Sequence, residues 1–159
     1  MSSQRPEDFM REAIHLAEQG MRGGRGGPFG CVVVRGGEIV GRGNNRVTST
    51  NDPTAHAEVV AIREACASLA TFQLEDCELF TSCEPCPMCL AAIYWARLDR
   101  FYYGCTAADA EVIGFSDDLI RRQTVLPAEA RSIPAIPLMR AESLAAFEAW
   151  TSKVDRVPY

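Results

Sequence analysis

The sequence contains no long apolar run and no apolar stretch near its N-terminus. A helix that spans a membrane needs roughly 18 or more predominantly apolar residues, and no segment of the 159 residues reaches that length. The first eight residues, Met1 to Asp8, lack the apolar core of a secretion signal. We therefore expect no membrane partner, and a cytoplasmic location is the default expectation.

The chain also lacks an excess of positive charge. Sixteen lysine and arginine residues are outnumbered by 21 aspartate and glutamate residues, which gives a formal net charge of −5. Proteins that bind phosphate backbones without sequence preference depend on a positive field. Nucleic acid is therefore a disfavoured partner, and we interpret the scattered arginines as a solvated surface.

There is no internal repeat, no low-complexity run and no linker long enough to divide the chain. A length of 159 residues suits one domain with a core of its own. We therefore expect a single domain over residues 1–159.

Apolar residues alternate between helical and strand patterns along the chain. Helical spacing predicts helices over residues 6–20, 55–69, from 87 onward and 141–153. Short apolar runs predict strands over residues 29–34, 38–43, 77–81, 100–103 and 133–139, and the turn at 35–37 joins the first two as a hairpin. Strands alternating with helices predict a layered α/β fold.

Three of the seven cysteines lie close together, at Cys83, Cys86 and Cys89. In a chain without a secretion signal, this clustering indicates a metal or catalytic site more than a disulfide framework. Cys86 and Cys89 share one face of the helix that Pro87 opens. The dipole at a helix start lowers the pKa of a thiol, and the thiolate is the form that binds zinc.

His56 and Glu58 open the helix that is predicted upstream. His56 offers a third ligand, and zinc with three protein ligands keeps a fourth position for water, as catalytic sites do. Glu58 lies about 200° around the helix from His56, so both reach one metal only if it lies beyond the helix N-terminus. His-x-Glu paired with Pro-Cys-x-x-Cys is typical of zinc deaminases, whose glutamate moves protons without binding the metal.

The sequence therefore predicts one Zn²⁺ on His56, Cys86 and Cys89, with Glu58 as acid and base. The main alternative is a closed structural zinc with Cys83 as fourth ligand. We interpret His15 as an ordinary helix residue. The other cysteines are most simply small, buried hydrophobic residues: Cys31, Cys66, Cys77 and Cys105.

Further segments extend these motifs along the chain: Gly26 to Gly30, Asn44-Asn45, Asn51 to Glu58, Thr81 to Cys89, Ala92 to Arg97 and Ile113 to Phe115. With them the chain resembles the cytidine-deaminase-like superfamily, and within it the bacterial guanine deaminases, over nearly its whole length. The resemblance implies a three-layer α/β/α fold whose central mixed sheet has five strands, with helices on both faces. It also implies hydrolysis of guanine to xanthine and ammonia.

The resemblance also implies roles for individual residues. Asn45 is expected to hydrogen-bond the purine edge, and Phe29 to lie against the ring. Asp117 is expected to contact guanine and assist proton transfer, although Asp118 stays open as the aligned residue. Ala57 and Trp95 are expected to contribute to the same substrate pocket.

The C-terminal tail has an implied role of its own. Residues 154–159 are expected to reach a partner subunit, so that Tyr159 closes the neighbour's pocket in a homodimer with exchanged C-terminal segments. The alternative is an ordinary mobile chain end.

Other functions stay open at this point. A guanosine deaminase or a deaminase of another aminated heterocycle would use the same motifs, and so would a tRNA adenosine deaminase, which the negative charge disfavours. A zinc-stabilised interaction module is the non-enzymatic alternative. The presence of Glu58 argues against it, because a structural zinc needs no carboxylate there.

Overall fold

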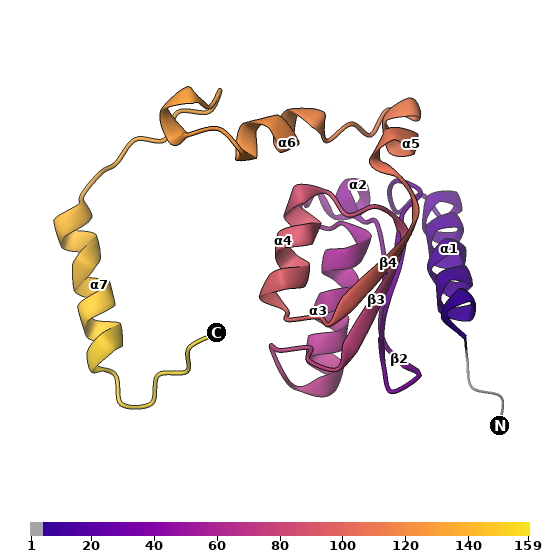
Figure 1. Ribbon diagram of the computed structural model, residues 1–159, viewed down its shortest axis with the longest axis horizontal. Coiled ribbons are helices and arrows are strands. Elements are labelled where there is room, and N and C mark those ends of the chain that lie inside the picture. The colour runs from indigo at the N-terminus through magenta and orange to yellow at the C-terminus, as the bar shows by residue number, and fades with distance from the viewer. Residues whose placement is uncertain (1–4) are drawn as a thin grey trace. The chain divides into compact units, whose positions relative to one another are not determined.

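The computed structural model describes residues 5–159 (Figure 1). The elements in chain order are α1 (Pro6–Arg22), β1 (Gly30–Arg35), β2 (Glu38–Asn44), α2 (Val47–Thr50), α3 (Ala57–Leu69), β3 (Cys77–Cys83), α4 (Pro87–Trp95), β4 (Arg100–Cys105), α5 (Ala107–Val112), α6 (Asp118–Thr124), a 3-10 turn (Ala128–Ala130) and α7 (Arg140–Ser152). Among these described residues, no helix combines the length and the apolarity needed to cross a bilayer.

The strands form one mixed sheet in the order β2-β1-β3-β4. β1 is antiparallel to both of its neighbours, as the pairs Cys31–Thr81 and Gly30–Asn44 illustrate. β3 and β4 are parallel, with Leu79 opposite Phe101. The expected mixed α/β sheet is therefore confirmed.

Alternating side chains of β1 enter two separate cores. Cys31 and Val33 pack with residues of α3 and α4 on one face of the sheet. Val32 and Val34 pack on the other face against Phe9 of α1. Because side chains alternate across a strand, this double burial requires helices on both faces, and the expected three layers are confirmed (Figure 1).

α3 packs very closely on β2. A Cβ atom at Gly43 would collide with the carbonyl oxygen of Ala57 and lie 2.7 Å from the backbone nitrogen of Ala61. Only a residue without a side chain therefore lets the first turn of α3 approach the sheet at this point. The close contact fixes the N-terminus of α3, where His56 precedes the helix.

The expected fifth strand at residues 133–139 is wrong, so the sheet has four strands among the described residues. Ile133, Ile136 and Leu138 are each at least 81% exposed and bury no apolar face. Pro134 and Pro137 lack the N–H that a strand ladder needs. The helix expected over 141–153 is confirmed as Arg140–Ser152.

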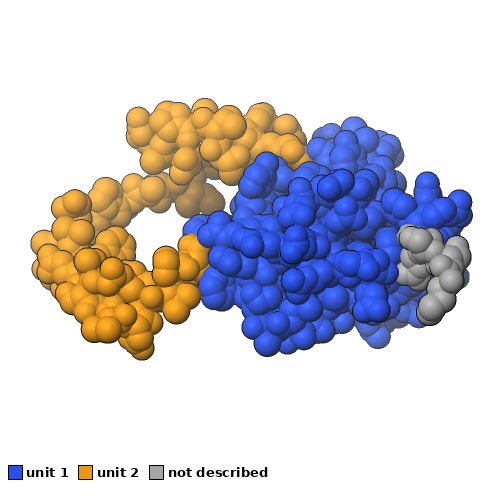
Figure 2. All heavy atoms as spheres, turned by 60° about the horizontal axis from the view of Figure 1, so that its bottom comes forward, with its two compact units in different colours: residues 1–117 blue, residues 118–159 orange. Residues whose placement is uncertain are grey.

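The chain divides into two compact units, residues 1–117 and 118–159 (Figure 2). The first contains the whole sheet together with α1 to α5. The second contains α6, the 3-10 turn and α7, and none of its residues is buried. The single domain expected from the sequence stays a prediction.

Candidate active site

Two helix starts carry the predicted metal ligands. His56 is the N-cap residue of α3, and Cys86 is the N-cap residue of α4, each with extended backbone angles. Pro87 occupies the first helical position after Cys86, where its missing N–H costs nothing and where it keeps Cys86 out of the helical conformation. Cys89, one turn later, is fully buried.

The three predicted ligands converge. The Nδ1 atom of His56 lies 3.6 Å from the sulfur of Cys86 and 3.4 Å from the sulfur of Cys89. All three ligand atoms lie within 4.8 Å of one another. Tetrahedral zinc with Zn–S and Zn–N bonds of about 2.3 and 2.0 Å separates S and N by about 3.5 Å, so the donor set and its spacing fit Zn²⁺.

The same cluster shifts the protonation of its members. A hydrogen bond from Cys89 is the largest influence that lowers the pKa of Cys86, to about 4, and His56 lowers it further. In turn, Cys86 raises the pKa of His56 through a hydrogen bond. Cys89 shares its proton with Cys86, which raises its own pKa. The low pKa of Cys86 favours its thiolate, the form that metal binding requires.

Glu58 lies in the first turn of α3 and is only 6% exposed. Burial is the largest cause that raises the pKa of its carboxyl group. A raised pKa brings a carboxyl closer to the range in which it can both accept and release a proton near neutrality. Its place just after His56 agrees with a metal beyond the N-terminus of α3.

Cys83 does not join the cluster. Its sulfur contacts the carbonyl oxygen of Thr106 at 3.6 Å, and burial raises its pKa to about 11. Among the described residues, only His56, Cys86 and Cys89 form a group that could hold a metal ion. The geometry therefore favours an open three-residue site over a closed site with four ligands.

Asn45 and Phe29 lie side by side at the ends of β1 and β2. The backbone N–H of Asn45 donates to the carbonyl oxygen of Phe29 at 3.0 Å. Phe29 is half-buried and meets Phe115 edge to face, with ring centroids 5.0 Å apart. The sequence does not predict Phe115 as a site residue, although Phe115 ends the segment Ile113 to Phe115 that carries part of the resemblance.

The other predicted substrate residues lie in different settings. Ala57 opens α3 beside His56 and is fully buried. Trp95 is 66% exposed at the C-terminal end of α4, about 9 Å of helical rise from Cys89. Asp117 is half-buried just before α6. Tyr159 belongs to the second unit and is 74% exposed.

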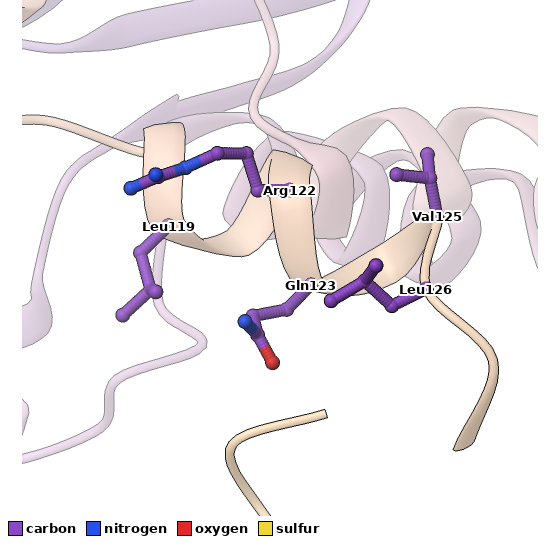
Figure 3. A pocket seen from close by; sticks show the side chains of 5 residues that line it. All are labelled: Leu119, Arg122, Gln123, Val125 and Leu126. Atoms are coloured by element: carbon purple, nitrogen blue, oxygen red, sulfur yellow. The ribbon is translucent and has the colours of Figure 1, made fainter. Parts of the chain in front are cut away.

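A shallow hollow along α6 contains none of the predicted site residues. Figure 3 shows its lining side chains, which all come from α6 and the two residues that follow it: Leu119, Arg122, Gln123, Val125 and Leu126. We assign it no function.

Comparison with known proteins adds independent evidence. Residues 3–105 match the family model of the cytidine and deoxycytidylate deaminase zinc-binding region. The chain is 49% identical to the guanine deaminase of Bacillus subtilis (strain 168) over 153 residues, which cover 96% of this chain and 98% of that protein.

Structural comparison gives a similar result. The crystal structure of guanine deaminase from Bacillus subtilis superposes with a TM-score of 0.95 at 48% identity, covering 98% of this chain and 99% of that one.

A tRNA-specific adenosine deaminase of Aquifex aeolicus is 40% identical over 97 residues, which cover 61% of this chain and 64% of that protein. The chain therefore belongs to the zinc-binding cytidine and deoxycytidylate deaminase family and, within it, to the guanine deaminases.

Proposed function

We propose that the protein is a zinc-dependent guanine deaminase, which converts guanine and water into xanthine and ammonia. The observation that carries this proposal is the 49% identity to a guanine deaminase over 96% of the chain. The His56, Cys86 and Cys89 cluster supplies the matching metal chemistry.

The ligand set assigns one Zn²⁺ to the chain, held by Nδ1 of His56 and by the sulfurs of Cys86 and Cys89. When bound, zinc lowers the pKa of a coordinated water towards neutrality and so supplies a nucleophile. The helix starts of α3 and α4 hold the three ligands in place, and the packing of α3 on Gly43 fixes one of those starts.

Glu58 moves the proton in this proposal. Its carboxylate takes a proton from the attacking water and delivers it to N3 of guanine while the water oxygen bonds to C2. The hydroxyl on C2 then gives its proton to Glu58, which passes it to the amino group, because an amine is a poor leaving group until it is protonated. The C–N bond breaks, ammonia leaves, and the C2 carbonyl of xanthine forms. The high burial and raised pKa of Glu58 suit this alternation between acid and base.

The substrate pocket is assigned to Phe29, Asn45, Ala57, Trp95 and Asp117. Phe29 lies against the ring, Asn45 bonds the purine edge and Asp117 assists proton transfer. Asp118, which pairs with Arg122 at 2.9 Å within α6, stays the alternative to Asp117.

We also propose a homodimer with exchanged C-terminal segments, in which Tyr159 closes the partner's pocket. The support is that residues 118–159 include no buried residue, although many of their apolar side chains are large. Seven free thiols support a reducing compartment, and the cytoplasmic location expected from the sequence stays part of this proposal.

Ammonia release tests the substrate. The purified protein is offered guanine, guanosine, adenine, cytosine and tRNA at equal concentrations. We expect guanine to give a kcat/KM at least about 100-fold above any other compound, because buried polar contacts discriminate strongly. Faster release from guanosine or from tRNA would replace the proposal with the corresponding alternative.

A further inference from the structure

Asn45 is almost completely buried, with only 6% of its surface exposed. Its side-chain oxygen accepts two backbone hydrogen bonds, from the N–H of Gly27 at 3.3 Å and from the N–H of Val47 at 3.1 Å. A backbone N–H can only donate, so the atom that it meets must be the amide oxygen. These two bonds therefore fix which end of the Asn45 amide faces which way.

The nitrogen end of the same amide can donate hydrogen bonds to a ligand. Within residues 5–159, the Nδ2 group of Asn45 has no hydrogen-bond partner, yet it is not among the fully enclosed polar atoms. An unpartnered amide in a largely buried place costs free energy until an acceptor arrives. Asn45 thus offers N–H donors only, since its oxygen is already used twice.

The loop that holds the oxygen depends on Gly26. A Cβ atom at position 26 would collide with the Asn45 side-chain oxygen and lie 2.6 Å from its backbone oxygen. The preceding residue is anchored on both sides: the N–H of Arg25 donates to Gly20 at 2.9 Å, and its carbonyl accepts from Ser49 at 3.3 Å. The loop therefore cannot move aside freely to make room.

We propose that Gly26 is a positioning residue that acts through Asn45. By letting the loop backbone approach closely, it holds the Asn45 amide as a donor, so the bound base must present an acceptor there, a ring nitrogen or a carbonyl oxygen. This inference rests on the proposed function and extends it from the substrate contact to the residue that orients it.

A double-mutant cycle tests the positioning by kinetics. We expect Gly26→Ala to lower kcat/KM for guanine by about tenfold or more, the loss of a well-placed hydrogen bond. In the Asn45→Ala background, the same change should lower kcat/KM by a clearly smaller factor, because the side-chain amide is gone and only the clash with the backbone of residue 45 remains. Equal losses in both backgrounds would overturn the proposal.

Gly24→Ala is the matched control within the same loop. Gly24 has a φ of +69°, and a Cβ atom there would meet nothing within 4 Å, so this change strains the backbone without touching Asn45. We expect Gly24→Ala to keep kcat/KM within about twofold of the wild type. All variants are compared at equal bound zinc, and a control loss as large as that of Gly26→Ala would also overturn the proposal.

A second measurement needs no substrate. The backbone N–H signals of Gly27 and Val47 in a ¹⁵N spectrum should shift in Asn45→Ala, shift again in Gly26→Ala and stay in place in Gly24→Ala. Unchanged signals in Gly26→Ala would overturn the positioning role. If these signals shift while the wild-type protein releases no ammonia from guanine, then the positioning stands and the proposed function fails.

Discussion

At the scale of residues, chemistry is concentrated at two helix starts. His56 and Cys86 are N-cap residues, and Glu58 lies in the first turn behind His56. Side chains at these positions point beyond the helix end, where the exposed N–H groups favour negative charge. Neighbouring groups shift the two pKa values in opposite directions: Cys89 lowers the pKa of Cys86 through a hydrogen bond, and burial raises the pKa of Glu58.

Glu58→Gln should separate metal binding from turnover. The amide keeps the shape of the side chain but cannot accept a proton, so we expect kcat to fall by about 10²- to 10⁴-fold while bound zinc stays at the wild-type level. Steady-state kinetics with elemental analysis of the protein measures both. Glu64→Gln, an exposed site on the same helix, should leave kcat unchanged. Near-normal turnover in Glu58→Gln would remove this residue from the mechanism.

Cys89→Ser should weaken zinc binding. We expect the affinity for Zn²⁺ to fall by more than about 100-fold, because loss of a group that only hydrogen-bonds to a metal ligand already lowers metal affinity by about 10- to 100-fold. Competition with a chromogenic chelator measures the affinity. Cys105→Ser, at an exposed cysteine, is the control and should bind zinc like the wild type. Equal affinities for the two variants would contradict the assigned ligand set.

At the scale of elements, local pattern accounts for most of the sheet and its covering helices. The apolar run of β1, the turn at residues 35–37 and the helical spacing of α3 are local signals, and the structure confirms these elements. The expectation for residues 133–139 failed because an apolar run cannot show whether a neighbouring strand exists. α2 was not expected, since its four residues carry no apolar periodicity.

The site was predictable to different degrees for a physical reason. The candidate ligands His56, Cys86 and Cys89 are predicted from residue types within two short motifs, and the structure brings their ligand atoms within 4.8 Å of one another. The hydrogen bond from the backbone N–H of Gly27 to the side-chain oxygen of Asn45 joins residues 18 positions apart. A sequence does not indicate which backbone N–H of a loop will meet a distant side chain. Phe115 likewise meets Phe29 only through the fold.

The end of α3 offers a test of stability. Ala70 has a left-handed backbone, with φ 50° and ψ 43°, which costs a residue with a Cβ atom roughly 1–2 kcal/mol. We expect Ala70→Gly to raise the free energy of unfolding by about 0.5–1 kcal/mol, as measured by urea denaturation. Ala67→Gly, exposed within the same helix, should lower it by a similar amount. Destabilisation by both would contradict the account of this helix end.

At the scale of the whole molecule, residues 118–159 leave most of their apolar side chains exposed. None of them is buried, and Val125, Ile133, Ile136 and Leu138 are each more than four-fifths exposed. Exposed apolar surface of this extent marks an interaction site. The proposed exchange of C-terminal segments would cover this surface with a second copy of the chain and would bring Tyr159 to the partner's pocket.

Mixed dimers test the exchange of tails. One chain carries Glu58→Gln and the other lacks residues 156–159, and each homodimer should be nearly inactive with normal zinc. If the tail serves the partner's pocket, the mixed dimer contains one site with an intact Glu58 and an intact tail. We then expect mixing under exchange conditions to restore up to about a quarter of the wild-type activity, because random exchange makes about half of the dimers mixed and each of these has one complete site of two. No restoration, with mixed dimers verified by mass, would contradict the exchange.

In the proposed function, one zinc ion per chain enables the hydrolysis of guanine, and a metal titration measures this dependence. Zinc is removed with a chelator, the retained fold is checked by circular dichroism, and Zn²⁺ is added back while xanthine formation is followed. We expect no xanthine without metal and a rate of xanthine formation that rises linearly until one equivalent of Zn²⁺ per chain is bound. Xanthine formation by the metal-free protein, or none at full zinc occupancy, would contradict it.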